Sequence, residues 1–218
     1  MDLEFSGEHL VLLAERAVFW PRRATLFVAD LHLGKDASFR KHGIPVPQGI
    51  GREDLERLSD ILRQVNAGRL VFLGDLVHAS SGLTPSTIGT VAGWRSGQPD
   101  LHIVLVRGNH DRSAGDPPPE WKIECVSEPE EDPPFLLHHA PPERANPFPA
   151  LAGHLHPAVT LVGAANTHMT LPCFWMRANT LVLPAFTGFS GRPRIAPEVG
   201  DRFFVAGEGQ VVEAACFE

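Results

Sequence analysis

Thiols are scarce in this sequence. Its 218 residues include three cysteines, Cys125, Cys173 and Cys216, which lie far apart along the chain. The number is odd and no CxxC pair occurs, which argues against a disulfide framework and against a zinc site built from thiolates. We therefore expect reduced, packed thiols, as is usual in a cytoplasmic protein.

Long apolar runs are also missing. No stretch approaches the roughly 18 uninterrupted apolar residues that a membrane helix requires. The first segment, MDLEFSGEHLVLLAERAVFW, carries acids ahead of a short apolar run and lacks the basic start and small-residue cleavage site of a signal peptide. These absences predict a soluble cytoplasmic protein that does not bind membranes.

Positive charge is in deficit as well. Lys and Arg number 19 against 26 Asp and Glu, which gives a formal net charge of -7 at pH 7. A field of this sign repels a polyanion unless bound cations or a local basic patch reverse it. The overall charge therefore gives no support for nucleic-acid binding.

Short apolar segments that end in Gly or a polar residue recur along the chain. Two predicted helices separate the first three of these segments. The first has helical periodicity from Leu55 to Val65 and Gly68 as its expected C-cap, and the second starts at the N-cap signature Thr84-Pro85. The alternation predicts βαβ units and a parallel sheet, in which ligands bind beyond the carboxyl ends of the strands. Five segments are predicted to be buried strands of this kind: residues 25–29, 69–73, 102–106, 135–137 and 150–152.

The C-terminal part has a different pattern. Strands without intervening helices are predicted there, and the segment before Thr25 is predicted to be a hairpin. A second sheet facing the first would bury this β-rich part. The proline-rich stretches are predicted to be surface loops, so residues 1–218 are interpreted as one domain. The C-terminal strands are expected at residues 159–162, 169–176, 180–186, 202–206 and 210–214.

Side chains with metal-binding chemistry stand at the expected strand ends. They are oxygen and imidazole donors without a thiolate, a set that suits Mn, Fe or Zn better than a structural zinc site. A carboxylate shared by two cations keeps them roughly 3.5–4 Å apart, and Asp75 is the candidate for this bridge. The donors occur in five motifs: Asp30-Leu31-His32, Gly74-Asp75, Gly108-Asn109-His110-Asp111, His138-His139 and Gly153-His154-Leu155-His156.

These motifs, in this order over residues 30–156, resemble the signature of the calcineurin-like metallophosphoesterases. The resemblance implies an α/β fold, a four-layer αββα sandwich in which two facing mixed sheets are flanked by helices. It also implies two divalent metal ions, with Mn²⁺ expected and Fe or Zn as alternatives. Phosphoester hydrolysis would proceed by in-line attack of a metal-bridging hydroxide.

The resemblance also implies a role for each motif residue. His110 would stabilise the phosphate charge or act as general acid, and Asp111 would orient it. His138-His139 replaces the usual His-Gly of the family, so either histidine is a candidate ligand, and His138 is preferred because similar relatives use the first. Of the remaining histidines, His78 is assigned to packing, with the outer shell of the site as the alternative. The ligands would be Asp30, His32 and His156 for one metal and Asn109, His138 and His154 for the other, bridged by Asp75.

Further stretches resemble one subgroup of the family, the ligase-associated phosphoesterases of bacteria (the PdeM group). This resemblance implies hydrolysis of a phosphodiester in DNA or RNA during DNA repair, together with a DNA ligase, a helicase and an exonuclease. A phosphoesterase for cyclic nucleotides, nucleotides or phosphomonoesters is the alternative, and a non-catalytic scaffold is disfavoured because no ligand is missing. The stretches are Trp20 to Arg23, Gly43 to Pro47, Leu171 to Trp175 and Leu183 to Phe186.

A basic cluster follows the first expected ligands. Lys35, Arg40, Lys41 and His42 are well placed to meet phosphates flanking the scissile one, although a solvated loop explains the cluster equally well. The acidic run at residues 128–132 is interpreted as a solvated loop.

Overall fold

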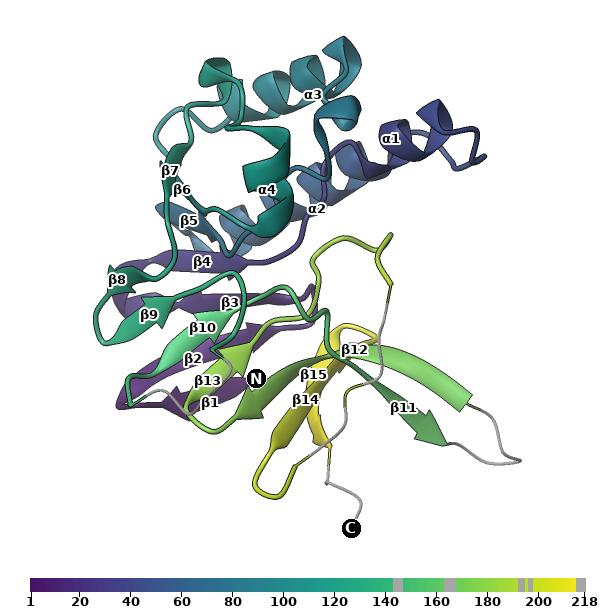
Figure 1. The fold of residues 1–218 in the computed structure, drawn as a ribbon. Coiled ribbons are helices and arrows are strands. Elements are labelled where there is room, and N and C mark those ends of the chain that lie inside the picture. The colour runs from purple at the N-terminus through teal and green to yellow at the C-terminus, as the bar shows by residue number, and fades with distance from the viewer. Residues whose placement is uncertain (143–146, 163–167, 192–194, 196–197, 215–218) are drawn as a thin grey trace.

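Two mixed β-sheets face each other in the computed structural model, which describes residues 1–142, 147–162, 168–191, 195 and 198–214 (Figure 1). The first sheet has seven strands that follow one another in chain order. They are β1 (Asp2–Phe5), β2 (Glu8–Leu13), β3 (Ala17–Trp20), β4 (Thr25–Val28), β5 (Arg69–Phe72), β6 (His102–Val106) and β7 (Glu124–Val126).

The half of the first sheet from β4 to β7 is parallel, whereas β1 to β3 pair antiparallel. Val28 lies opposite Phe72, and Phe72 lies opposite Leu105. Strands β4, β5 and β6 therefore end side by side at one edge. The residues that follow them are delivered to the same place, as predicted for a parallel sheet.

The second sheet has eight strands in the order β15-β14-β12-β13-β10-β9-β8, with β11 paired to β12. Strands β9, β10 and β13 are mutually parallel and the other pairings are antiparallel. The strands are β8 (Glu130–Asp132), β9 (Phe135–Leu137), β10 (Ala150–Ala152), β11 (Ala158–Val162), β12 (His168–Arg177), β13 (Thr180–Val182), β14 (Arg202–Gly207) and β15 (Gln210–Ala214).

Helices flank the seven-stranded sheet. The long apolar face of α2 buries Leu58 and Leu62 in one cluster with Leu70 and Leu105 of the sheet. All four α-helices of the described residues lie on this outer side (Figure 1). They are α1 (Lys35–Lys41), α2 (Ile50–Val65), α3 (Pro85–Ser96) and α4 (Asn109–Ala114), and short 3₁₀ turns occupy Pro21–Arg23, Ser80–Gly82 and Pro119–Trp121.

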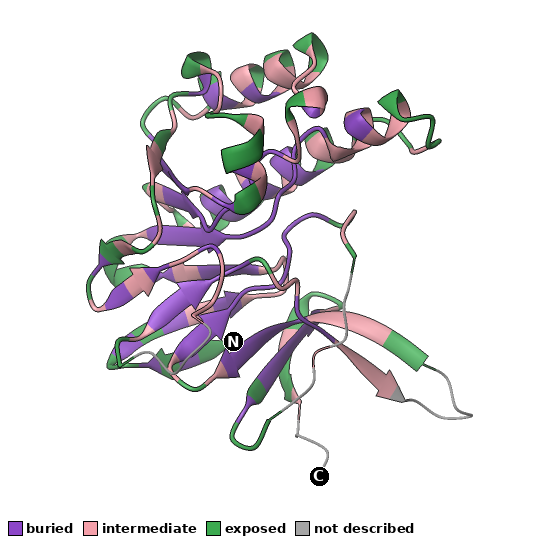
Figure 2. Ribbon diagram, viewed as in Figure 1, coloured by how far each residue is buried: buried purple, intermediate pink, exposed green. Residues whose placement is uncertain are grey.

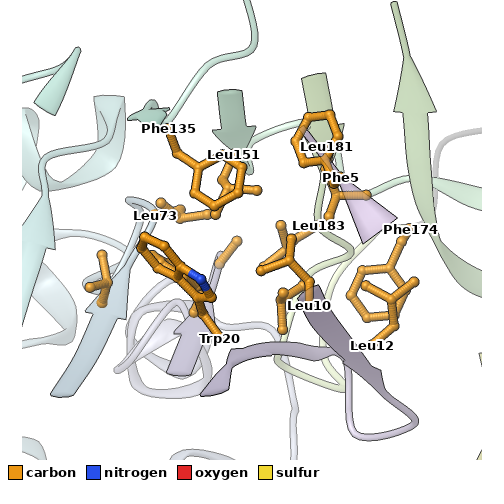
Figure 3. Packing of buried hydrophobic residues seen from close by; sticks show 14 of the residues in the cluster. Phe5, Leu10, Leu12, Trp20, Leu73, Phe135, Leu151, Phe174, Leu181 and Leu183 are labelled. Carbon is orange, nitrogen blue, oxygen red and sulfur yellow. The ribbon is translucent and has the colours of Figure 1, made fainter. Parts of the chain in front are cut away.

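Aromatic and aliphatic side chains from both sheets fill the space between them (Figure 3). Phe135 of the second sheet stacks on Phe5 at 5.6 Å and meets the edge of Trp20 at 5.2 Å, measured between ring centroids. Buried residues accordingly run along the strands of both sheets (Figure 2). The prediction of an α/β fold with two facing mixed sheets and flanking helices is confirmed; of the four layers predicted, the described residues show one helical layer, over the seven-stranded sheet.

Local predictions succeed where a periodic or capping signal exists. The Thr84 side chain caps α3 by accepting a hydrogen bond from the Thr87 N–H at 3.2 Å. Helix α2 ends earlier than predicted, because Asn66 with φ +53° forms the C-cap in place of Gly68. The strand predicted at residues 180–186 ends at Val182, and the short helices α1 and α4 were not predicted.

The described part of the chain contains no helix with both the length and the apolar character needed to span a bilayer. Cys173 is buried and Cys125 is half-buried, and both are free thiols, as predicted. Cys216 lies outside the described residues.

Candidate metal centre

The carboxyl ends of strands from both sheets meet at one site. Asp30 and Asp75 follow β4 and β5, and the backbone N–H of Asp30 donates to the Gly74 carbonyl at 3.1 Å. His154 follows β10 of the second sheet, and its N–H donates to Asp30 Oδ2 at 2.9 Å. A hydrogen bond from the His154 backbone to the Asp30 side chain thus connects the two sheets at this point.

Five of the predicted ligands have a left-handed backbone, which is uncommon for residues other than Gly. Each such conformation costs about 1–3 kcal/mol, and residues of this kind cluster at functional sites. Their φ angles are +56° at Asp30, +50° at His32, +52° at Asp75, +69° at His154 and +47° at His156.

Glycines allow the ligands to approach one another closely. A Cβ on Gly74 would lie 2.1 Å from His139 Nδ1, and one on Gly108 would lie 2.2 Å from Asp75 Oδ1. Neither position tolerates a side chain. These contacts explain the Gly that precedes Asp75 and Asn109 in the motifs.

The first group of donors comprises Asp30, His32 and His156, which lie close enough together to hold one ion. His156 Nε2 is 3.3 Å from Asp30 Oδ1 and 3.4 Å from His32 Nε2. Asp30 Oδ1 is buried without a hydrogen-bond partner among the described residues. Burial lowers the pKa of His32 to about 2, so its imidazole is neutral at pH 7, the form that binds metal.

The second group comprises Asp75, His139 and His154, which also lie close enough together to hold an ion. His139 Nε2 is 3.4 Å from Asp75 Oδ1 and 3.0 Å from His154 Nδ1. Asn109 extends this group, because its Oδ1 is 2.9 Å from the same nitrogen. Four donors therefore converge on one small volume.

Asp75 and His139 stabilise opposite charges on each other. Burial alone would raise the pKa of the Asp75 carboxyl, but the hydrogen bond and charge of His139 lower it to about 2. Burial alone would lower the pKa of His139, but Asp75 and Asp30 raise it to about 9. A divalent cation bound here would replace the proton of His139, so binding would release protons.

The two adjacent histidines after β9 occupy different environments. The His139 ring is completely buried, and its Nδ1–H donates to the Leu73 carbonyl at 3.0 Å, which directs Nε2 toward Asp75. His138 Nε2 is buried without a hydrogen-bond partner among the described residues and lies outside both donor groups. The preference for His138 is therefore corrected, and His139 replaces it in the ligand set proposed below.

A direct comparison of the two histidines tests this correction. We expect His139→Ala to weaken Mn²⁺ binding by more than about tenfold, since it removes a donor from the second group. His138→Ala should weaken it far less. Titration calorimetry of both variants measures the difference, and the reverse order of affinities would restore His138 as the ligand.

His110 stands between the donor groups and solvent. Its side chain is 36% exposed, and its Nε2 lies 3.9 Å from Asp75 Oδ2. The Nδ1–H donates to the His78 carbonyl at 2.6 Å, and this bond fixes the ring with Nε2 toward the site. His110 is thus oriented by the backbone at His78.

The hydrogen bonds of Asp111 go to two backbone segments beside the site. Its carboxylate accepts hydrogen bonds from the N–H groups of Val77 and Gly108, both at 2.9 Å. These bonds join the segment after Asp75 to the start of α4. Because Val77 precedes His78, whose carbonyl binds the His110 ring, the prediction that Asp111 orients His110 stays a prediction, with the backbone at Val77 and His78 as the connection.

Two residues near the site were assigned to other roles by sequence reasoning. His78 stacks on His110 with ring centroids 4.9 Å apart, so the assignment to simple packing is replaced by its alternative, the outer shell. Glu128 was placed in a solvated loop, yet its Oε2 accepts from the His139 N–H at 2.8 Å and from the Ala140 N–H at 3.0 Å. The position of His78, three residues after Asp75, indicated in the sequence that it could lie near the site. No feature of the sequence indicated this for Glu128.

Comparison with known proteins adds independent information. The family model of the calcineurin-like phosphoesterases matches residues 24–154. A crystal structure of Pseudomonas putida nuclease MPE is similar over 98% of this chain and 99% of that chain, with 39% identity and a TM-score of 0.85. The Yfce phosphoesterase from E. coli is 16% identical over 88% of this chain and 98% of that chain, with a TM-score of 0.41. No curated protein matches the chain.

The matched region contains four of the five motifs completely and the first histidine of the last one. The likeness to the Pseudomonas nuclease extends over both sheets and is consistent with the ligase-associated subgroup. The chain therefore belongs to the calcineurin-like phosphoesterase family and is a metal-dependent phosphoesterase.

Proposed function

We propose that this protein hydrolyses phosphodiester bonds of nucleic acid with two divalent metal ions. One observation carries the proposal: two groups of donors, each close enough to hold an ion, adjoin each other at Asp30 and Asp75. A third group of side chains that could hold an ion consists of His32, His78 and His110. Possible metal donors therefore extend from the two groups toward solvent.

The residues present fit two hard or borderline cations. Asp30 Oδ1 is a buried carboxylate oxygen that lacks a hydrogen-bond partner among the described residues, as expected of an atom reserved for a metal. The remaining donors are carboxylate, amide and imidazole groups, which suit Mn²⁺, Fe or Zn. We assign Asp30, His32 and His156 to one ion and Asn109, His139 and His154 to the other, with Asp75 shared.

Bound cations would supply Lewis-acid chemistry, which activates a water nucleophile and neutralises charge on the phosphate. The protein's own residues would do the rest. His110 faces the site with Nε2, so it can donate a proton to the leaving oxygen while the His78 carbonyl holds the ring. Asp111 would act through the loops that it joins.

A nucleic-acid substrate is supported by the whole-length similarity to a protein described as a nuclease. With Mn²⁺ we expect hydrolysis of bis(p-nitrophenyl) phosphate and of a DNA or RNA oligonucleotide, much slower hydrolysis of p-nitrophenyl phosphate, and loss of all activity with EDTA. Preference for p-nitrophenyl phosphate or a 2′,3′-cyclic nucleotide over oligonucleotides would favour the small-molecule alternative. Activity that survives EDTA would contradict the metal-dependent mechanism.

Finer aspects of the proposal rest on the subgroup resemblance. These are Mn²⁺ as the working metal, a cytoplasmic location, and action in DNA repair with a DNA ligase, a helicase and an exonuclease. Restoring EDTA-treated protein with Mn²⁺, Fe²⁺ or Zn²⁺ in parallel tests the metal. Greater sensitivity to DNA damage in cells that lack the protein tests the pathway.

A further inference from the structure

Lys35 lies beside the metal centre without belonging to it. It is the first residue of α1, three positions after His32, and it is half-buried. Burial lowers the pKa of Lys35, and the charge of Asp30 opposes this shift without a hydrogen bond between them. The positive charge of Lys35 therefore lies near the proposed ligand Asp30, and its ammonium can bind another anion.

Two aromatic rings flank this ammonium. Lys35 Nζ lies 5.8 Å from the ring centroid of Phe39 and 5.4 Å from that of Phe189. Both distances lie within the range of cation–π attraction. The two rings contact each other at 5.5 Å with an interplanar angle of 70°, so they present two walls of a corner.

The two walls come from segments that are far apart in the sequence. Phe39 is on α1, whereas Phe189 belongs to the loop after β13, which reaches up toward the helices (Figure 1). The Arg57 guanidinium on α2 donates to the Phe186 carbonyl in this loop and lies over the Phe186 ring at 4.0 Å. The loop is thus attached to the helical layer at Phe186, three residues before Phe189.

The aromatic corner continues into the site. Phe39 meets the edge of His78 at 5.8 Å, and His78 stacks on His110 at 4.9 Å. His110 is the residue proposed to face the scissile phosphate. Lys35 therefore stands at the end of a row of rings that leads away from the reacting phosphate.

Two other members of the basic cluster, Arg40 and His42, are engaged elsewhere. Arg40 pairs with Asp36 at 3.0 Å, and His42 bonds to the Ser38 carbonyl at 2.8 Å. A protein with a net charge of -7 needs a local cation to hold a polyanion. Lys35 is the cluster member whose charge acts on the proposed ligands Asp30 and His32.

We propose that Lys35 binds the substrate phosphate adjacent to the scissile one and that Phe39 and Phe189 position its ammonium. This inference rests on the proposed nucleic-acid substrate, because a nucleic acid presents a second phosphodiester beside the scissile one, whereas a cyclic nucleotide or a simple phosphomonoester has a single phosphate. The rings act as positioning residues through the ammonium, and no covalent step involves them.

The test compares Lys35→Ala with wild type on a deoxythymidine dodecamer and on bis(p-nitrophenyl) phosphate, which has a single phosphate. We expect kcat/KM to fall about tenfold more for the dodecamer than for the small diester. The slope of log kcat/KM against log salt for the dodecamer should decrease by roughly 0.7, the value for one lost phosphate contact on a single strand. Lys35→Arg should restore most of both quantities.

Two further variants separate positioning from general damage. Phe189→Leu should raise KM for the dodecamer severalfold with little change in kcat, and adding it to Lys35→Ala should cause no further loss, because both act through one ammonium. Arg63→Ala removes an equal charge at the C-terminal end of α2, where Arg63 is exposed and pairs with Asp60, and it controls for net charge.

The outcomes distinguish this inference from the proposed function. Equal losses on both substrates for Lys35→Ala would place Lys35 at the scissile phosphate, and an unchanged salt slope would remove it from phosphate binding. Either result overturns the inference and leaves the phosphodiesterase intact. Wild-type protein that hydrolyses the small diester but no oligonucleotide would overturn the nucleic-acid substrate and the inference together.

Discussion

Replacing Asp75 with Ala is expected to lower kcat/KM by more than about 100-fold for every phosphodiester substrate, a larger effect than the loss of an outer-shell partner. Asp75 belongs to the second donor group and lies beside the first, because its backbone carbonyl accepts from the His32 N–H at 2.9 Å. Its removal also takes away the charge opposite His139. Metal content should fall below two ions per chain. Steady-state kinetics and elemental analysis of the same preparations measure both effects.

Two matched variants support the interpretation of Asp75. Asp75→Asn keeps the shape of the side chain, so a similar loss would assign the effect to charge. Asp116→Asn changes an exposed carboxylate that pairs with Arg107, and a surface pair of this kind contributes little. An Asp75→Ala protein that retained two metals and wild-type turnover would contradict the proposed bridge.

His110→Ala should lower kcat on an oligonucleotide by about 10²–10⁴-fold, the usual contribution of a general acid, while both metals remain bound. The reason is geometric, because the Nδ1 bond to the His78 carbonyl leaves Nε2 directed toward the site. The loss should be smaller for bis(p-nitrophenyl) phosphate, whose leaving group needs no proton. Comparing the two substrates separates proton donation from charge stabilisation.

The control for His110 is His102→Ala. His102 is an exposed histidine that pairs with Glu124. It is the first residue of β6, at the opposite end of this strand from the site. Its replacement should leave kcat close to wild type. Equal kcat for His110→Ala and His102→Ala would remove His110 from the reaction, and loss of metal in His110→Ala would assign it to ligation.

The sequence predicted most of the fold because its signals were local. Apolar runs predicted the buried strands β5 and β6, which are followed closely by Gly-Asp and Gly-Asn. The Thr84-Pro85 cap predicted the start of α3. Helices α1 and α4 escaped prediction because they are short, with seven and six residues, and carry no apolar periodicity. Their positions depend on tertiary contacts with the loops around them.

The sequence motifs predicted which residues form the site, but not all the contacts that these residues make in the folded protein. The structure brings together every predicted donor except His138, because each follows a strand whose end lies at the same edge. The choice between His138 and His139 depends on which face of β9 meets Gly74, and adjacent residues of a strand point to opposite faces. Likewise, Asp111 and His110 are neighbours in sequence, and only the structure shows that their side chains bind adjacent backbone groups, the Val77 N–H and the His78 carbonyl.

The central claim is that this cluster holds two cations that share Asp75. Anomalous diffraction from crystals soaked in Mn²⁺ tests it most directly. We expect two peaks roughly 3.5–4 Å apart, one beside Asp30, His32 and His156 and one beside Asn109, His139 and His154, with Asp75 contacting both. A single peak, no peak, or a peak bound by His138 instead of His139 would contradict the account.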